Sequence, residues 1–314
     1  MKIGDPTSYG TIVAADGDRY FCRIVGTAQL VVWIEPAMGG LSAEWWTIQN
    51  RIAEFATVVA WDRAGYGWST KPTRRRSPLN VASEMRAVMS ALGLAGRPLI
   101  LVGHSLGGLY VRAFLHAFPD AVKGMLLLDP MSPDDNRASE LLTPEVYSKS
   151  GFDKTSAMAA TQLLSSLSVL RLLKPWVLKS PPFHYYGNLV SGEAVEIIWR
   201  SMLKPSFFGT MLAEYRESHN PEHVTQLKSM RHATAAPLTV LYHDPTVLID
   251  EIVKYGGLSP ADAQRVEDVW REIVGEYLNV STNSRFVEVP KASHYVHMAA
   301  PDVVVNRCRE MAAP

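Results

Sequence analysis

The chain has 314 residues, and 31 Lys and Arg balance 31 Asp and Glu, so the formal net charge is zero. A content of 47% hydrophobic and 20% charged residues is typical of a globular protein and argues against intrinsic disorder. The zero net charge argues against a nucleic-acid-binding protein, because phosphate contacts require a basic excess. Small molecules are therefore the expected partners.

The same sequence argues against membrane insertion, secretion and metal binding. No stretch reaches the roughly 18 consecutive apolar residues that a membrane span requires. The first six residues lack the apolar segment of a signal peptide. The only two cysteines, Cys22 and Cys308, have no metal-like spacing. We therefore expect a cytoplasmic protein without an integral membrane segment or a metal; the oligomeric state is not predictable from these features.

Along the chain, short apolar runs alternate with longer amphipathic stretches. The expected strands are Arg19–Gly26, Leu30–Glu35, Thr57–Asp62, Leu99–His104, Val122–Asp129, Leu238–His243 and Arg285–Val289. The expected helices are Ala43–Glu54, Leu79–Leu92, Leu106–Phe118, Pro260–Leu278 and Pro301–Met311. Continuously apolar strands are typical of parallel strands that are buried on both faces. The alternation therefore predicts an α/β fold, in which a mostly parallel central sheet carries helices on both faces.

One long segment interrupts this alternation. Between about residues 132 and 236 the pattern predicts only helical pieces, which are separated by Pro144, Pro175, Pro181, Pro182, Pro205 and Pro221. We interpret it as a helical cap, or lid, inserted over the carboxyl edge of the sheet. The predicted organisation is a core in two parts, 1–131 and 237–314, with a cap at 132–236. A helical subdomain without a lid function is the alternative.

The strongest chemical motif is Gly103-His104-Ser105-Leu106-Gly107, which fits G-x-S-x-G. It lies between an expected strand and an expected helix, where a serine adopts a strained turn and projects its oxygen above the sheet. Glycines on both sides allow close backbone approach. The helix N-terminus favours a developing negative charge. We predict that Ser105 is a catalytic nucleophile.

A serine nucleophile requires a general base within hydrogen-bonding reach. Of the nine histidines, we favour His294, because it lies in the loop between the last strand and the last helix. This position fits the chain order serine, acid, histidine. His297 is the main competitor, His243 is less well placed at a strand end, and His104 is expected to be structural.

The chain resembles the α/β-hydrolase superfamily, specifically its lid-bearing esterase and lipase-like branch. The matching stretches are 31–46, 61–69, 102–108, 126–130 and 292–297, which cover both halves of the sheet and leave the insert unmatched. The resemblance implies a serine hydrolase that uses no cofactor. Haloalkane dehalogenases and epoxide hydrolases share this fold but have aspartate as the nucleophile, so Ser105 argues against both.

Three aspartates compete for the acid that orients the histidine. Asp129 ends the strand expected beside Leu99–His104, the strand that leads into the turn at Ser105 (the nucleophile elbow), and some family members have the acid in this place. Asp244 ends the following strand, which is the commoner family position, but Pro245 follows it directly. Asp250 lies further along the same loop. We favour Asp129, with Asp244 and Asp250 as alternatives.

Acyl transfer also requires donors for the oxyanion. One is the backbone N–H of Leu106, directly after the nucleophile. The resemblance places the second in the loop after Glu35, where the family usually has H-G-x-x-G and this chain has Pro-Ala-Met-Gly-Gly. Met38 occupies the donor position, and Ala37 is the alternative.

The predicted cap is rich in aromatic residues, namely Trp176, Phe183, Tyr185, Tyr186, Trp199, Phe207, Phe208 and Tyr215. Such a cap favours a substrate with an apolar part, although packing onto the core also requires apolar side chains. We therefore predict a serine hydrolase of a carboxylic ester, lactone or thioester with an apolar acyl or lactone moiety. The alternatives are a cofactor-free perhydrolase, a carbon–carbon hydrolase, or a ligand receptor with little turnover.

Overall fold

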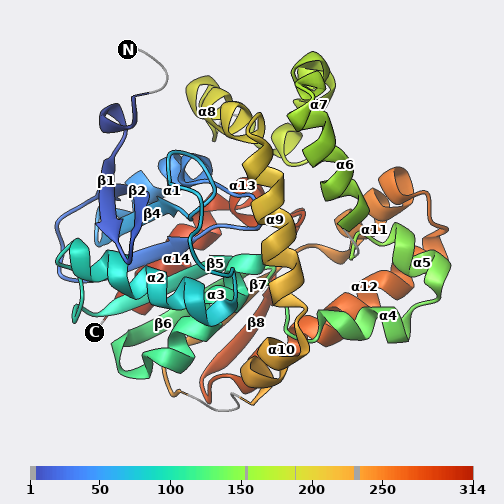
Figure 1. Cartoon of the computed structure of the whole chain (residues 1–314). Helices are drawn as coiled ribbons and strands as arrows, with labels where there is room; N and C mark the ends of the chain where they lie inside the picture. The colour runs from blue at the N-terminus through green and yellow to red at the C-terminus, as the bar shows by residue number, and fades with distance from the viewer. Residues whose placement is uncertain (1–4, 153–154, 188, 230–233, 314) are drawn as a thin grey trace.

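A central eight-stranded sheet organises the structure, a computed structural model that describes residues 5–152, 155–187, 189–229 and 234–313 (Figure 1). The strand order is β1-β2-β4-β3-β5-β6-β7-β8. β2 is antiparallel to β1 and β4, and the other neighbouring pairs are parallel. The strands are β1 (Thr11–Ala15), β2 (Asp18–Val25), β3 (Val31–Glu35), β4 (Thr57–Asp62), β5 (Leu99–His104), β6 (Val122–Leu128), β7 (Leu238–Tyr242) and β8 (Ser284–Glu288). The predicted mostly parallel sheet is therefore confirmed.

All seven predicted strands are present, each with ends within one residue of the prediction, and the structure adds β1 at the edge of the sheet. Every residue of β3, β4, β5 and β7 is buried, as expected for strands covered on both faces. β1 has only Val13 buried, so it lacks the apolar run by which the interior strands are recognised.

The parallel register brings the ends of four strands together. Glu35 of β3 pairs with Gly103 of β5, and His104 of β5 pairs with Leu128 of β6. Leu128 pairs in turn with Leu241 of β7. The residues that follow these strand ends therefore meet at the carboxyl edge of the sheet, where α/β proteins bind ligands.

Helices cover both faces of the sheet (Figure 1). α2 and α3 pack on one face, in a core with the large rings of Trp33 and Trp61, and α1 and α14 cover the other. The α-helices are α1 (Trp46–Ile52), α2 (Pro78–Ala91), α3 (Leu106–Ala117), α4 (Ala138–Leu141), α5 (Pro144–Lys149), α6 (Thr155–Ser166), α7 (Lys174–Val177), α8 (Gly192–Met202), α9 (Pro205–Ser218), α10 (Pro221–Lys228), α11 (Pro245–Glu251), α12 (Pro260–Gly275), α13 (Val296–Ala299) and α14 (Pro301–Ala312). The predicted helix at Ala43–Glu54 is divided into a 3₁₀ turn, η2 (Ser42–Trp45), and α1.

The chain between β6 and β7 contains α4 to α10. α9 packs against α6 and α8, and a shared apolar cluster joins α8 and α9 to Leu41, Tyr66 and Met298 of the sheet-bearing part. The predicted boundaries, 131/132 and 236/237, fall between β6 and α4 and directly before β7. Within the residues described, no helix is long and apolar enough to cross a membrane.

Candidate active site

Ser105 lies on a sharp turn between β5 and α3, with φ 53° and ψ −121°. A positive φ is rare for a serine and stores strain, so hydrogen bonds must hold the turn. The Ser105 N–H donates to the Leu128 carbonyl over 3.0 Å, and the Ser105 carbonyl accepts from the N–H groups of Gly108 and Met131 at 2.8 and 2.9 Å. The turn is therefore fixed both by its own helix and by the end of β6.

The two glycines of the motif are required by close backbone contacts. A Cβ atom at Gly107 would lie 2.3 Å from the Glu35 carbonyl oxygen, and one at Gly103 would lie 2.8 Å from the Gly107 carbonyl oxygen. Real Cβ atoms do not approach backbone this closely, so β3, β5 and α3 can meet here only without these side chains. The spacing of the motif is thus a packing requirement of the elbow.

The structure brings Asp129 and His294 together. His294 Nδ1 lies 2.5 Å from Asp129 Oδ2, although 165 residues separate them in the chain. Asp129 follows β6 with φ 40°, and its N–H donates to the Leu241 carbonyl over 2.8 Å. The side chain of Asp129 is completely buried, whereas that of His294 is 19% exposed. The contact with Asp129 fixes Nδ1 of His294, while part of the His294 side chain stays accessible to solvent.

A second histidine, which sequence reasoning placed lower, shares the same carboxylate. His243 Nδ1 lies 2.8 Å from Asp129 Oδ1, and His243 Nε2 lies 2.7 Å from Glu267 Oε2. Burial alone would lower the pKa of His243, but Asp129 and then Glu267 raise it to about 10. Burial alone would likewise raise the pKa of Asp129, but His243 and then His294 hold it below its usual range. At neutral pH the group is an imidazolium between two carboxylates.

The competing residues have other roles in the structure. Asp244 caps α11: its Oδ1 accepts from the Thr246 N–H at 3.0 Å, and its Oδ2 accepts from the Lys291 N–H at 2.8 Å. Asp250 is exposed on α11. His297 is buried and stacked on Trp45 at 4.1 Å, and burial holds its pKa well below the usual value. Of the three aspartates proposed as the acid, Asp129 is the one beside His294.

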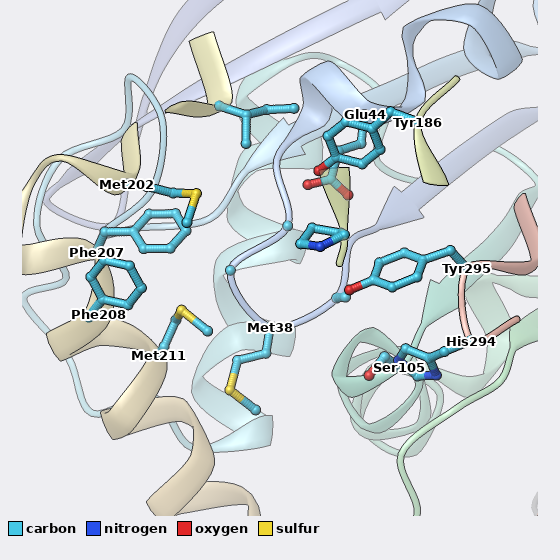
Figure 2. A pocket seen from close by; sticks show the side chains of 15 residues that line it. Met38, Glu44, Ser105, Tyr186, Met202, Phe207, Phe208, Met211, His294 and Tyr295 are labelled. Carbon is cyan, nitrogen blue, oxygen red and sulfur yellow. The ribbon is translucent and has the colours of Figure 1, made fainter. Parts of the chain in front are cut away.

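Ser105 and His294 line the same cavity, which has a volume of about 200 Å³ (Figure 2). Most of its other lining residues are apolar, and α8 and α9 contribute Ile198, Met202, Phe207, Phe208 and Met211. A smaller cavity of about 30 Å³ also reaches Ser105 and is lined by Phe152, Tyr215 and Trp270 among others. The serine therefore faces one large and one small space.

The aromatic residues of the predicted cap divide into several groups. Phe207, Phe208 and Tyr186 line the large cavity, and Tyr215 lines the small one. Phe183 and Trp199 are buried in the apolar cluster, Tyr185 packs against it, and Trp176 is 69% exposed. Packing therefore accounts for some of these side chains, as the alternative interpretation allowed, while others contact the cavity.

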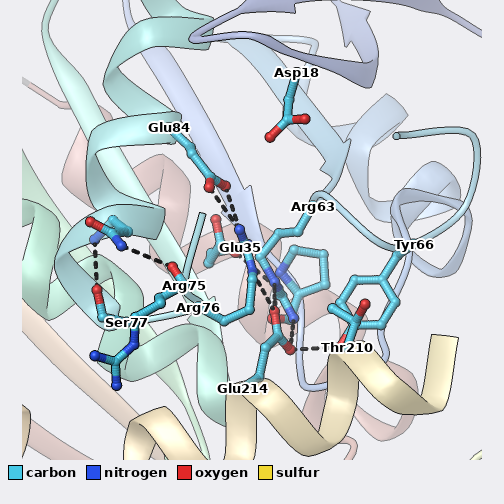
Figure 3. Close-up of polar contacts among 12 residues, drawn as sticks. Asp18, Glu35, Arg63, Tyr66, Arg75, Arg76, Ser77, Glu84, Thr210 and Glu214 are labelled. Atoms are coloured by element: carbon cyan, nitrogen blue, oxygen red, sulfur yellow. Dashed lines mark hydrogen bonds and ion pairs between the residues drawn. The ribbon is translucent and has the colours of Figure 1, made fainter. Parts of the chain in front are cut away.

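The loop after β3 lies beside Ser105 and is held by a buried arginine, Arg63 (Figure 3). Its guanidinium donates to the Pro36 carbonyl at 2.7 Å and to the Ala37 carbonyl at 2.8 Å. It also forms ion pairs of 2.9 Å with Glu35 and with Glu214 of α9. Sequence reasoning missed this support. The feature of the sequence that could have indicated this support is Arg63 itself, because it is a cation that precedes small and apolar residues directly after β4.

Both predicted oxyanion donors lie next to Ser105. Leu106 is the first residue of α3, and Met38 lines both cavities that reach the serine. Ala37, the alternative donor, lines the large cavity as well. Within the described residues, no group of three or more His, Cys, Asp or Glu side chains is arranged to hold a metal ion.

Comparisons with known proteins identify the family of the chain. A protein from Gibberella zeae described as an AB hydrolase superfamily protein is 24% identical over 96% of this chain and 93% of its own. The (lyso)-N-acylphosphatidylethanolamine lipase of Mus musculus is 31% identical, over 44% of this chain and 40% of the lipase. The solved structure of the epoxide hydrolase CorEH superposes with a TM-score of 0.66 at 18% identity, over 96% of this chain and 97% of that one. The model of the alpha/beta hydrolase family matches residues 26–307, and the chain therefore belongs to this family.

Proposed function

We propose that the chain is a serine hydrolase that cleaves a carboxylic ester, lactone or thioester with an apolar moiety. The observation that carries this proposal is the 2.5 Å contact between His294 Nδ1 and Asp129 Oδ2, with His294 and Ser105 on the wall of one apolar cavity. A histidine held by a buried carboxylate beside an elbow serine is the arrangement needed to activate a hydroxyl group.

In the proposed mechanism, the Ser105 oxygen attacks the substrate carbonyl while His294 Nε2 accepts the hydroxyl proton. Asp129 holds the ring and stabilises its charged form. The N–H groups of Leu106 and Met38 bind the oxyanion that forms. The tetrahedral intermediate then expels the alcohol or thiol, which takes the proton from His294. His294 then takes a proton from water, which attacks the acyl-enzyme. The second tetrahedral intermediate releases the carboxylic acid, and the Ser105 oxygen takes the proton back from His294.

A fluorophosphonate probe tests this proposal, because it labels an activated serine covalently. We expect labelling of the native chain, loss of labelling in Ser105→Ala, and unchanged labelling in Ser166→Ala, which changes an exposed serine of α6. Turnover of short and medium p-nitrophenyl esters should follow the labelling. Equal labelling of native chain and Ser105→Ala refutes the proposal. Labelling of Ser105 without turnover of any ester supports a ligand receptor instead.

A further inference from the structure

One wall of the large apolar cavity carries a buried carboxyl group that the proposed reaction does not use. Glu44 lies in η2, directly after the loop beside Ser105, and is 5% exposed. Its Oε1 accepts from the Leu41 N–H at 3.2 Å, which closes the first turn of η2. Burial raises the pKa of Glu44 to about 7. Among the described residues no Lys, Arg or His forms an ion pair with this carboxyl.

A second polar group lines the same cavity beside Glu44. Tyr186 is 2% exposed, and its hydroxyl is directed towards the Glu44 carboxyl, whose pKa it lowers, without completing a hydrogen bond of good geometry. A carboxylate can accept several hydrogen bonds, so Glu44 keeps acceptor capacity for a ligand in the cavity in addition to its contact with the Leu41 N–H. In Figure 2 both side chains lie on the far side of Tyr295 from Ser105 and His294.

We propose that Glu44 and Tyr186 form a polar subsite on the wall of the large cavity beyond Tyr295, which binds a hydrogen-bond donor, a hydroxyl or an ammonium group, at the end of the substrate's apolar chain. This inference rests on the proposed hydrolase function. The apolar side chains that line the same cavity, among them Ile198 and Phe207, would contact the methylene groups of such a substrate. A substrate with an apolar chain and a distal hydrogen-bond donor would contact the apolar lining with its chain and the Glu44–Tyr186 subsite with its donor.

Esters that differ only at the end of the chain test the subsite. We would compare p-nitrophenyl alkanoates from butanoate to decanoate with their terminal hydroxy and terminal amino forms, and acetates of primary alcohols with those of the matching diols and amino alcohols. At one chain length, kcat/KM should be roughly tenfold higher for a donor-bearing ester, because one buried hydrogen bond is gained. The preferred form identifies the donor.

Two variants assign this preference to the subsite. Tyr186→Phe removes only a hydroxyl, and Glu44→Gln keeps the hydrogen bond to the Leu41 N–H but removes the negative charge. We expect both variants to reduce the preference for the donor-bearing ester several-fold relative to the plain ester of the same chain length. Tyr185→Phe is the matched control, because the Tyr185 hydroxyl contacts Glu251 outside the large cavity. Equal kcat/KM for all chain ends, with plain esters turned over, overturns the subsite alone. Absence of turnover and of probe labelling overturns the proposed function.

A second inference concerns the outer surface of α6 and α7. Seven large hydrophobic residues of the described chain are exposed, and four of them, Leu163, Leu167, Leu172 and Trp176, lie in this short segment. The sequence from Thr155 to Gly192 contains Arg171, Lys174 and Lys179 but no acidic residue, and of these cations Lys174 pairs with Glu196 of α8 at 2.6 Å. Exposed apolar side chains next to cations are typical of a surface that enters the interface of an anionic membrane. The segment stands at the outer end of the helical insert in Figure 1.

We propose that the surface formed by Leu163, Leu167, Leu172 and Trp176 docks on anionic lipid. The test is co-sedimentation of the native chain with phosphatidylglycerol vesicles and with phosphatidylcholine vesicles. We expect binding to the anionic vesicles that weakens in high salt and falls at least about tenfold in Leu172→Ser/Trp176→Ser, because both the charge and the apolar contacts are used. The control variant is Leu278→Ser, an exposed leucine elsewhere. Absence of vesicle binding overturns the proposal. If the native chain instead dimerises with increasing concentration and Leu172→Ser/Trp176→Ser abolishes the dimer, the surface contacts a second copy of the chain, and the proposal is also overturned.

Discussion

The charged state of His243 leads to a quantitative prediction for stability. Its imidazolium lies between Asp129 and Glu267, and its pKa rises from the usual 6.5 to about 10. A pKa that is higher in the folded state contributes stability that is fully present below 6.5 and is lost as pH rises through 10. At about 1.36 kcal/mol per pH unit, the contribution is on the order of 4–5 kcal/mol at pH 6 and about 1.5 kcal/mol at pH 9.

His243→Asn tests this prediction, because asparagine can still donate to Asp129 but carries no charge. Urea unfolding of native chain and variant at pH 6 should give a difference in unfolding free energy of roughly 3–5 kcal/mol, since two buried carboxylates lose their cation. At pH 9 the difference should be roughly 3 kcal/mol smaller. His223→Asn is the matched control: its pair with Glu217 is longer, at 3.4 Å, and partly exposed, so we expect less than about 1 kcal/mol. If the unfolding free energies of native chain and His243→Asn differ little, and by the same amount at pH 6 and pH 9, the prediction that His243 is charged is refuted.

Three further predictions concern the acid, the loop beside the serine, and the thiols. Asp129→Asn should lower kcat about a thousand-fold in an ester assay, because His294 loses its carboxylate partner. Asp244→Asn should keep a near-native kcat. The reverse result would assign the acid to Asp244. Arg63→Lys should lower the unfolding free energy by about 3–5 kcal/mol and reduce kcat. The reason is that lysine cannot bind the Glu35 and Glu214 carboxylates and the two carbonyls of the loop after β3 at the same time. An unchanged unfolding free energy and an unchanged kcat would contradict this prediction. Burial raises the pKa of Cys308 to about 12 and that of Cys22 further, so native protein should not react with a disulfide reagent until it unfolds; rapid labelling of either would show that burial is wrong.

The parts of the site that depend on local sequence could be predicted. The elbow at Ser105 needs a strand, small residues and a helix within a few positions, and all of these are visible in the sequence. Asp129 could be placed because a parallel strand directly after the elbow helix pairs with the elbow strand, and this pairing is observed. The position of His294 follows from the same logic at the last strand. Strand order placed Asp129 and His294 at the carboxyl edge of the sheet but left Asp244, Asp250 and His297 open as alternatives, because side-chain contacts such as that of Asp129 with His294 are not visible in the sequence.

The polar supports of the site could not be predicted, because they join distant segments through side chains. Arg63 and Glu214 are 151 residues apart, and their contact depends on how α9 crosses the sheet edge. His243 and Glu267 meet only because α12 packs beside the end of β7. No periodic pattern marks such pairs. A buried charge has to be compensated, but the sequence does not show which opposite charge lies near it.

The position of Glu214 also limits which of the helices between β6 and β7 can move. Its buried carboxylate binds Arg63 and accepts a 2.7 Å hydrogen bond from Tyr66, so α9 is anchored to the sheet by three fully buried polar side chains. α7 has no comparable anchor, and its Trp176 is 69% exposed. Because local opening follows the scarcity of buried contacts, backbone amides of α7 should exchange with deuterium much faster than those of the interior of α9. Equal exchange in α7 and α9 would contradict this expectation, and any movement of these helices together would then have to break the Arg63–Glu214 pair. If α7 alone exchanges quickly, access to Ser105 would be controlled by the outer helices while α9 keeps the loop beside the serine in place.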